Sequence, residues 1–223
     1  MISAPNRAFP PVVLGLLIAN GLFFFLQSNA PYLLTPLALW PAGTPDQAMS
    51  ARGLVDVPQF HIWQLVSYGF LHGGTSHLFF NMLALWMFGN ALENTWGSVR
   101  FAMFYFICVV GAGVVQLITV SIDAAQGSGI YPTVGASGGV YGILLGFGML
   151  FPNRIIVLLI PPIPMKAKYF VIVFGLIELV MGVTGTQSGV AHFAHLGGML
   201  FGLLLILYWR HKERQNSNYT IPF

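Results

Sequence analysis

The chain has 223 residues, of which 56% are hydrophobic and only 7% are charged, and its formal net charge is +3. A soluble domain has roughly 25% charged residues, whereas the mean hydropathy here is +0.76. These values exclude a soluble globular enzyme, a disordered protein and a nucleic-acid-binding protein. They indicate a polytopic helical membrane protein. The single cysteine, Cys108, can form neither an internal disulfide nor a thiolate cluster for a metal.

Six apolar stretches are long enough, or nearly long enough, to cross a bilayer, because a spanning helix needs ~20 mostly apolar residues. The first follows Arg7 as a signal peptide would, but its length and the proline at Pro31 favour a retained helix. We therefore expect an all-α bundle of six transmembrane helices in a single membrane domain, residues 1–223. The expected spans are about 9–27, 77–91, 101–122, 137–151, 169–184 and 192–209.

The basic residues indicate the orientation of this bundle. With six spans, the two termini and the loops after the second and fourth spans lie on one side of the membrane. Eight of the nine Lys and Arg residues fall there, and only Arg52 falls on the other side. Cytoplasmic segments carry an excess of such residues, so both termini are predicted to be cytoplasmic, as in a bacterial-type plasma membrane. The eight are Arg7, Arg100, Arg154, Lys166, Lys168, Arg210, Lys212 and Arg214.

The connection from Ser28 to Ser76 is long, and loops of that length are usually functional. It contains Trp40, Trp63 and a partly apolar run over residues 60–66. Amphipathic aromatic side chains settle at the membrane interface. The sequence therefore predicts a long interfacial loop between the first and second helices.

Four polar residues stand at the non-cytoplasmic ends of different spans, where polar side chains mark functional sites. Ser137 opens the fourth span, His192 opens the sixth, and His77 and Asn81 lie in the first turns of the second. The even-numbered spans enter from the same side, so the topology brings all four to a similar depth. The fourth span is short, roughly 22 Å at ~1.5 Å per residue against a hydrocarbon core of about 30 Å. Ser137 is therefore expected below the outer surface, in a cavity that contains water.

Small residues recur every fourth position in two of these spans, which lets membrane helices approach closely. Packing of the two rows against each other is expected to bring Ser137 and His192 side by side. The rows are Gly138, Gly142 and Gly146 in the fourth span, and Ala194, Gly198 and Gly202 in the sixth.

These residue types favour nucleophilic catalysis. A serine hydroxyl becomes a strong nucleophile when a neighbouring histidine accepts its proton, and the oxyanion that forms needs preorganised donors. His77 and Asn81, together with the amides at the start of a helix, can supply such donors. Asp123 lies on the correct side, but nothing places it against His192. The prediction is therefore a dyad of Ser137 and His192 without an acidic third member.

Three motifs occur in order on alternate spans: His77-Leu78-Phe79-Phe80-Asn81, Gly135-Ala136-Ser137-Gly138 with Tyr141-Gly142, and Ala191-His192 with Gly197-Gly198. A further segment, Trp63-Gln64-Leu65 with Phe70-Leu71-His72-Gly73, leads into the second span. In these motifs the sequence resembles the rhomboid family of intramembrane serine proteases, and the resemblance extends from about Trp63 to Gly202.

The resemblance implies a serine endopeptidase that cleaves transmembrane segments of membrane-protein substrates near the outer face of the bilayer, with no cofactor and no metal. It implies that Ser137 is the nucleophile and His192 the general base. His77 and Asn81 would bind the oxyanion. Tyr141 would pack against the imidazole of His192, and Gly135 would support the nucleophile turn.

Three other interpretations are open. His192 and His195 form an H-x-x-H pair that could bind a metal with His77, although the H-E-x-x-H helix of zinc proteases is missing. A rhomboid-like protein could bind membrane helices without cutting them, and a small transporter would need paired ionisable residues near the midplane. Glu178 is the one charged residue in the middle of the fifth span, and it is expected to be a hydrogen-bonded structural carboxyl.

Overall fold

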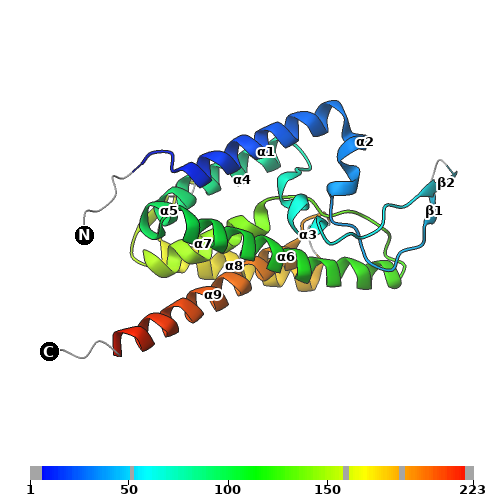
Figure 1. Ribbon diagram of the computed structural model, residues 1–223. Coiled ribbons are helices and arrows are strands. Elements are labelled where there is room, and N and C mark those ends of the chain that lie inside the picture. The colour runs from blue at the N-terminus through cyan, green and yellow to red at the C-terminus, as the bar shows by residue number, and fades with distance from the viewer. Residues whose placement is uncertain (1–6, 51–52, 158–160, 186–188, 219–223) are drawn as a thin grey trace.

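The computed structural model describes residues 7–50, 53–157, 161–185 and 189–218, and its helices form an elongated bundle (Figure 1). Four helices are long and apolar enough to cross a membrane: α1 (Pro11–Asn29), α6 (Ser98–Ala125), α8 (Ala167–Thr184) and the apolar part of α9 (His192–Asn218). The helix α7 (Ser137–Leu150) is apolar but shorter.

The second predicted span is a run of three consecutive helical segments. These are α4 (Thr75–Ala84), the π-helical η3 (Leu85–Gly89) and α5 (Asn90–Trp96). Each of the six predicted stretches therefore coincides with helix. The ends differ from the prediction by at most about five residues, except that α9 continues to Asn218 in place of 209. That all six cross the membrane stays a prediction, since four of the described helices meet the criteria of length and composition.

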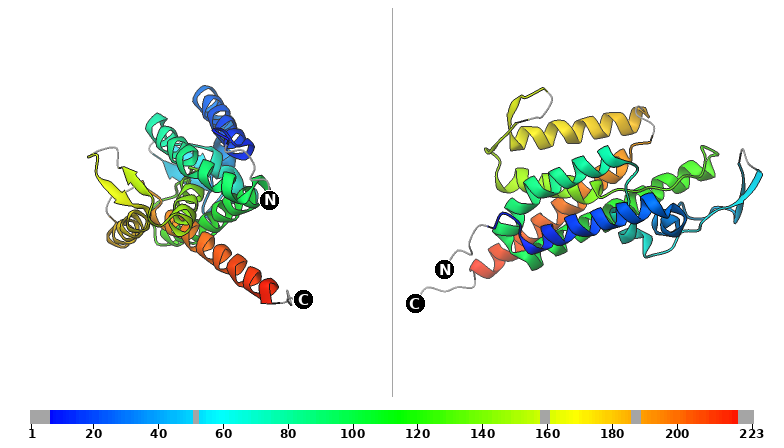
Figure 2. Two further views of the ribbon diagram at one scale, coloured as in Figure 1. Left: turned by 90° about the vertical axis from the view of Figure 1, so that its left-hand side faces the viewer. Right: turned by 90° about the horizontal axis from the view of Figure 1, so that it is seen from above.

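The connection between α1 and α4 contains several short elements. They are α2 (Pro31–Leu34), η1 (Thr35–Leu37), an antiparallel hairpin of β1 (Gln47–Ser50) and β2 (Gly53–Asp56), α3 (Gln64–Ser67) and η2 (Tyr68–Phe70). A second hairpin, β3 (Ile155–Val157) and β4 (Pro164–Lys166), joins α7 to α8. Figure 2 shows that the first hairpin projects at the end of the bundle opposite the start of α1 and the end of α9.

The centre of the bundle is the packing of α7 against α6 and α9. The predicted rows of small residues meet there. A Cβ atom on Gly198 would overlap the carbonyl oxygen of Gly138, and a Cβ atom on Gly142 would lie 3.1 Å from the carbonyl oxygen of Gly198. The backbones of α7 and α9 therefore approach as closely as glycine permits, and this fixes the register between the two helices.

Polar side chains hold α1 at both ends. The carboxylate of Glu93, which is only 2% exposed, accepts hydrogen bonds from the backbone N–H groups of Val12 (3.0 Å) and Val13 (2.8 Å). These amides lack helical partners and carry the positive end of the helix dipole. At the other end, the side chain of Gln27 exchanges two hydrogen bonds with the backbone of His72.

The segment that leads into α7 is irregular, but its backbone groups are paired with protein. Thr133 exchanges two backbone hydrogen bonds with Leu39, at 2.8 and 3.0 Å, and the N–H of Gly135 donates to the carbonyl of Tyr68 at 3.0 Å. Irregular backbone at membrane depth is tolerated where protein satisfies it. Ser137 can therefore begin a helix inside the bundle instead of at its surface.

The contact between α7 and α9 gives a stability prediction. Gly198→Ala places a methyl group against the Gly138 carbonyl, and overpacking of this kind costs typically 1–3 kcal/mol. We expect a lower midpoint of thermal unfolding in detergent than for the wild type. Gly21→Ala in α1 is the matched control, because a Cβ atom there meets nothing within 4 Å and alanine is the better helix former. An equal effect of both substitutions would contradict the assigned close approach.

Candidate functional site

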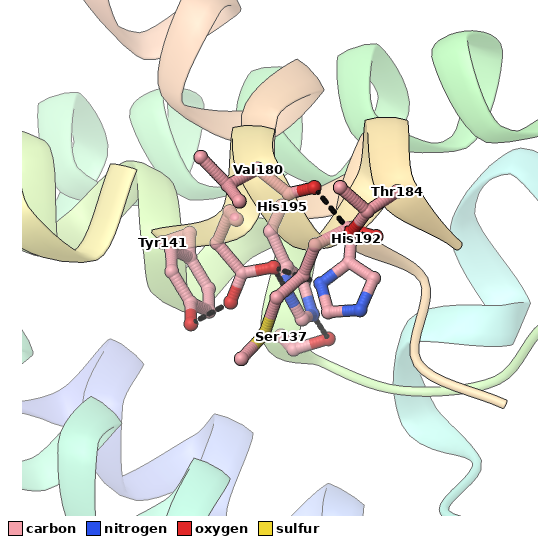
Figure 3. Close-up of polar contacts among 8 residues, drawn as sticks. Ser137, Tyr141, Val180, Thr184, His192 and His195 are labelled. Atoms are coloured by element: carbon pink, nitrogen blue, oxygen red, sulfur yellow. Dashed lines mark hydrogen bonds and ion pairs between the residues drawn. The ribbon is translucent and has the colours of Figure 1, made fainter. Parts of the chain in front are cut away.

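The site is built where α7 begins against the first turns of α9. The Oγ atom of Ser137 lies 2.8 Å from Nε2 of His195, within hydrogen-bond distance. Figure 3 shows these two side chains meeting between the two helices. His195 is buried, and Ser137 is partly buried.

The predicted contact between Ser137 and His192 is wrong. Gly138 packs against the backbone of Ala194 and Gly198, so the side chain opposite Ser137 comes from the residue after Ala194. His192 lies three residues earlier, about 60° around the helix and 4.5 Å along its axis. The sequence contained a signal for this register, because the row of small residues in this helix begins at Ala194 and not at Ala191.

Tyr141 lies one turn after Ser137, as expected, but its ring packs on a different histidine from the one predicted. It stacks on His195 with ring centroids 4.2 Å apart and an interplanar angle of 8°. The expectation that it packs on His192 is therefore corrected along with the pairing of Ser137. This stacking holds the plane of the His195 ring and so restricts the direction in which Nε2 points.

His77 lies on the other side of the serine. Its Nδ1 accepts a hydrogen bond from the backbone N–H of Gly73 at 3.3 Å, so in the neutral ring the proton is on Nε2. A Cβ atom on Gly135 would lie 2.9 Å from this Nε2 and 3.4 Å from Oγ of Ser137. The two polar groups therefore border the same small space. Gly135, with φ at +137°, is the residue type that both the backbone and the space require.

Asn81 follows His77 by one helical turn and is buried, with 6% of its surface exposed. Its Nδ2 donates to the backbone carbonyl of His77 at 2.9 Å. In the described part of the chain it makes no hydrogen bond to Ser137 or His195. The structure thus places His77 and Ser137 at the same small space, whereas the recorded hydrogen bond of Asn81 goes to the backbone of His77.

Glu178 on α8 reaches the same cluster, a position that sequence reasoning missed. One oxygen accepts a hydrogen bond from the hydroxyl of Tyr141, and the other lies 2.6 Å from Nδ1 of His192 and 2.9 Å from Nδ1 of His195. Its exposed fraction is 6%. Asp123, the acid considered from the sequence, instead accepts a hydrogen bond from the hydroxyl of Tyr131 at 2.6 Å.

Two glycines explain how α8 brings this carboxylate so close to α9. Gly175 and Gly182 lie about one turn before and after Glu178 and contact Met199 and His192 respectively. Residues at this spacing share one helix face. The two glycines on that face indicate that it packs closely against another helix, but they do not indicate which residues the acid contacts.

The same cluster has atoms that could hold a cation. One ligand atom from each of Glu178, His192 and His195 lies within 4.8 Å of the others. The 2.6 Å contact between the carboxylate and Nδ1 of His192, however, has the length of a charge-assisted hydrogen bond. The chemistry of the donor set therefore favours a hydrogen-bonded cluster of serine, histidines, tyrosine and carboxylate.

Comparison with known proteins agrees with this architecture. A Rhomboid domain is matched over residues 59–212. The chain belongs to the rhomboid family. It is similar to RHOMBOID-like protein 4 of Arabidopsis thaliana, with 30% identity over 83% of this chain and 42% of that protein. It is also similar to Rhomboid protein 1, mitochondrial, of Saccharomyces cerevisiae, with 27% identity over 96% of this chain and 68% of that protein.

A third relative is named as a protease. Rhomboid protease AarA of Providencia stuartii is 31% identical over 65% of this chain and 56% of its own length. The chain thus spans about two fifths to two thirds of the length of these relatives. Membership of the family and the apolar helices show an integral, multi-pass membrane protein of a family that includes serine intramembrane proteases.

Next to the site, His72 is a buried histidine in the loop before α4. It is 1% exposed, its ring lies edge-on to that of His77 at 5.1 Å, and neither ring nitrogen has a hydrogen-bond partner among the described residues. The pKa of His72 is lowered from 6.5 to about 4. Burial is the main cause, and the charge of the nearby His77 is the second. The folded protein therefore favours the neutral ring.

Acid is predicted to destabilise the protein through His72. Because its pKa in the folded state is depressed, the stabilisation is complete above pH 6.5 and is lost as the pH falls from 6.5 towards 4. The loss reaches on the order of 3 kcal/mol. In His72→Leu, the midpoint of thermal unfolding should fall less over this range than in the wild type. The exposed His61 provides the control, and His61→Leu should keep the wild-type dependence. An unchanged slope in His72→Leu would contradict the assignment.

Proposed function

We propose that this protein is an intramembrane serine endopeptidase in which Ser137 is the nucleophile and His195 is the general base. The observation that carries the proposal is the 2.8 Å contact between Oγ of Ser137 and Nε2 of His195. A nucleophile within hydrogen-bond distance of a base that a third group orients is the arrangement that covalent catalysis needs. The stacking of Tyr141 on His195 supplies that orientation.

In the first half of the reaction, Oγ of Ser137 forms a bond to the carbonyl carbon of the substrate while its proton moves to Nε2 of His195. The carbonyl oxygen becomes an oxyanion. The Nε2–H of His77, which borders the space above Gly135, and the unpaired amides in the first turn of α7 are the groups that can stabilise it. We assign Asn81 to the same function through His77, whose carbonyl it binds.

In the second half, the imidazolium of His195 donates its proton to the substrate nitrogen, and the carbon–nitrogen bond breaks. The product left on Ser137 is an acyl ester. A water molecule then attacks the ester carbonyl while Nε2 accepts its proton, and the proton returns to Oγ as the ester bond breaks. Every proton transfer uses the same nitrogen, which explains why one short contact is sufficient for both halves.

The substrates that fit this site are transmembrane segments of other proteins. A helix shields its backbone carbonyls, so a segment that unwinds easily near the site should be cleaved most readily. The described start of α1 and end of α9 lie at the same end of the bundle (Figure 2). Together with the basic residues, this supports a single membrane domain with cytoplasmic termini and cleavage near the outer face of a bacterial-type plasma membrane.

The proposal predicts a large effect on cleavage for the removal of Ser137 or His195 and a smaller one for the removal of His192. After reconstitution with a single-span substrate, Ser137→Ala and His195→Ala should each lower the cleavage rate by on the order of 10⁴-fold or more. The double variant should be little worse, because the pair acts as a unit. His192→Ala should lower the rate less, by about tenfold, because it removes only a hydrogen bond to Glu178.

Thermal unfolding of each variant in detergent controls for loss of folded protein. If His192→Ala abolished cleavage while His195→Ala retained it, the assignment of the base would be wrong. If Ser137→Ala retained the wild-type rate, the proposed function itself would be wrong.

A further inference from the structure

The proposed mechanism uses Nε2 of His195 and gives no role to the other ring nitrogen, Nδ1. Nδ1 of His195 lies 2.9 Å from Oε2 of Glu178. The carboxylate is 6% exposed, and its recorded contacts in the described chain all go to the site: Tyr141, His192 and His195. A buried carboxylate whose partners all belong to one cluster acts on that cluster.

The tautomer of His195 links this carboxylate to the reaction. To accept the proton of Ser137, Nε2 must be unprotonated, so a neutral ring must carry its proton on Nδ1. An ionised carboxylate accepts hydrogen bonds and cannot donate them. Glu178 beside Nδ1 therefore favours the tautomer that can act as a base. When the proton of Ser137 arrives, the positive imidazolium lies next to a negative charge.

Two other residues hold the carboxylate in this position. The hydroxyl of Tyr141 donates to Oε1, and Nδ1 of His192 forms the aligned hydrogen bond to Oε2 at 2.6 Å. Nδ1 of His195 also lies close to Oε2, but it forms no aligned hydrogen bond in the described chain. The direction of its N–H is therefore off the line to the carboxylate oxygen. Glu178 thus acts on His195 mainly through charge, while His192 and Tyr141 fix its position.

We propose that Glu178 is a positioning residue of the protease, so that the catalytic unit is a triad of Ser137, His195 and Glu178, with the carboxylate contributed by α8. This inference rests on the proposed function and goes beyond the predicted dyad. Glu178 does not touch the substrate. It sets the tautomer of the base and stabilises the imidazolium that forms when Ser137 attacks.

The test is Glu178→Gln in the full-length protein, reconstituted with a single-span substrate. Glutamine keeps the size of the side chain but removes the charge, and its amide can donate to Nδ1 and favour the wrong tautomer. We expect kcat to fall about 10²-fold, less than the roughly 10⁴-fold known for an aligned acid in such triads. KM should be unchanged. A kcat within twofold of the wild type would overturn the inference.

The pH profile separates positioning from a structural role. In the wild type, kcat/KM rises with pH as the imidazolium loses its proton. Among the described residues, the titratable groups around His195 are Glu178, Tyr141, His192 and His77. Loss of the one carboxylate makes imidazolium formation harder. The acid limb in Glu178→Gln should therefore move to lower pH, and an unmoved limb would overturn the inference.

Glu93 provides a matched control. It is also a buried carboxylate, but it caps α1 through the amides of Val12 and Val13. Glu93→Gln should lower the midpoint of thermal unfolding and leave kcat per folded protein and the acid limb as in the wild type. If both variants changed kcat and the limb alike, the effect of Glu178 would be structural and the inference would fail.

Two further measurements separate the remaining outcomes. Labelling of Ser137 by a fluorophosphonate probe reports the nucleophile itself. If the wild type neither labels nor cleaves, the proposed function fails, whereas an active wild type with an unaffected Glu178→Gln refutes only the positioning role. The wild type is also assayed with EDTA and with added Zn²⁺. Unchanged cleavage in EDTA supports the proposal, and activity that EDTA abolishes and Zn²⁺ restores would replace it by a metal site at Glu178, His192 and His195.

Discussion

The contact between the backbones of α7 and α9 is the constraint on which the rest of the structure depends. In lipid, apolar surface provides no net drive for helices to associate, so close packing must come from small residues. Here Gly198 meets Gly138 with no room for a Cβ atom on Gly198. Ser137 precedes Gly138, and His195 lies between Ala194 and Gly198. The approach of the two backbones therefore sets the distance between hydroxyl and imidazole before any hydrogen bond forms.

The carboxylate of Glu178 finds hydrogen-bond partners for both of its oxygens within an apolar bundle. A carboxylate in the middle of a membrane helix costs roughly 2.5–3.5 kcal/mol on insertion scales. Hydrogen bonds to a charged group contribute about 1.5–3 kcal/mol each. Glu178 accepts one from Tyr141 and one from His192, which is of the same order as the cost. The carboxylate can therefore remain ionised beside His195, because other groups hold it there.

The sequence was sufficient for some parts of this arrangement and insufficient for others, for physical reasons. Apolar length predicted the helices to within about five residues, apart from the polar end of α9, and the small-residue rows predicted which faces of α7 and α9 meet. The choice between His192 and His195 depended on register. An error of three residues leaves a side chain on nearly the same face of the helix, about 60° away. Only the start of the small-residue row at Ala194 therefore distinguished His195 from His192.

Glu178 could not be assigned from the sequence because its partners are distant along the chain. Tyr141 precedes it by 37 residues and His192 follows it by 14. Local periodicity carries no information about such pairs. Asn81 shows the opposite limit, because its one-turn spacing from His77 was readable, but the spacing does not reveal that its amide binds the carbonyl of His77. Spacing predicts a shared face and leaves the direction of each hydrogen bond undetermined.

The residues of the proposed triad are held by two different sets of helix contacts. Ser137 and His195 belong to the tightly packed centre, whereas α8 packs against α7 and α9 from one side and exposes much of its apolar surface (Figure 2). Gly175 and Gly182 hold it against α9 above and below Glu178. A shift of α8 would withdraw the carboxylate while Oγ of Ser137 stays beside Nε2. The packing of α7 against α9 therefore determines whether Ser137 and His195 meet. The packing of α8 against α9 determines whether the carboxylate of Glu178 stabilises the imidazolium of His195.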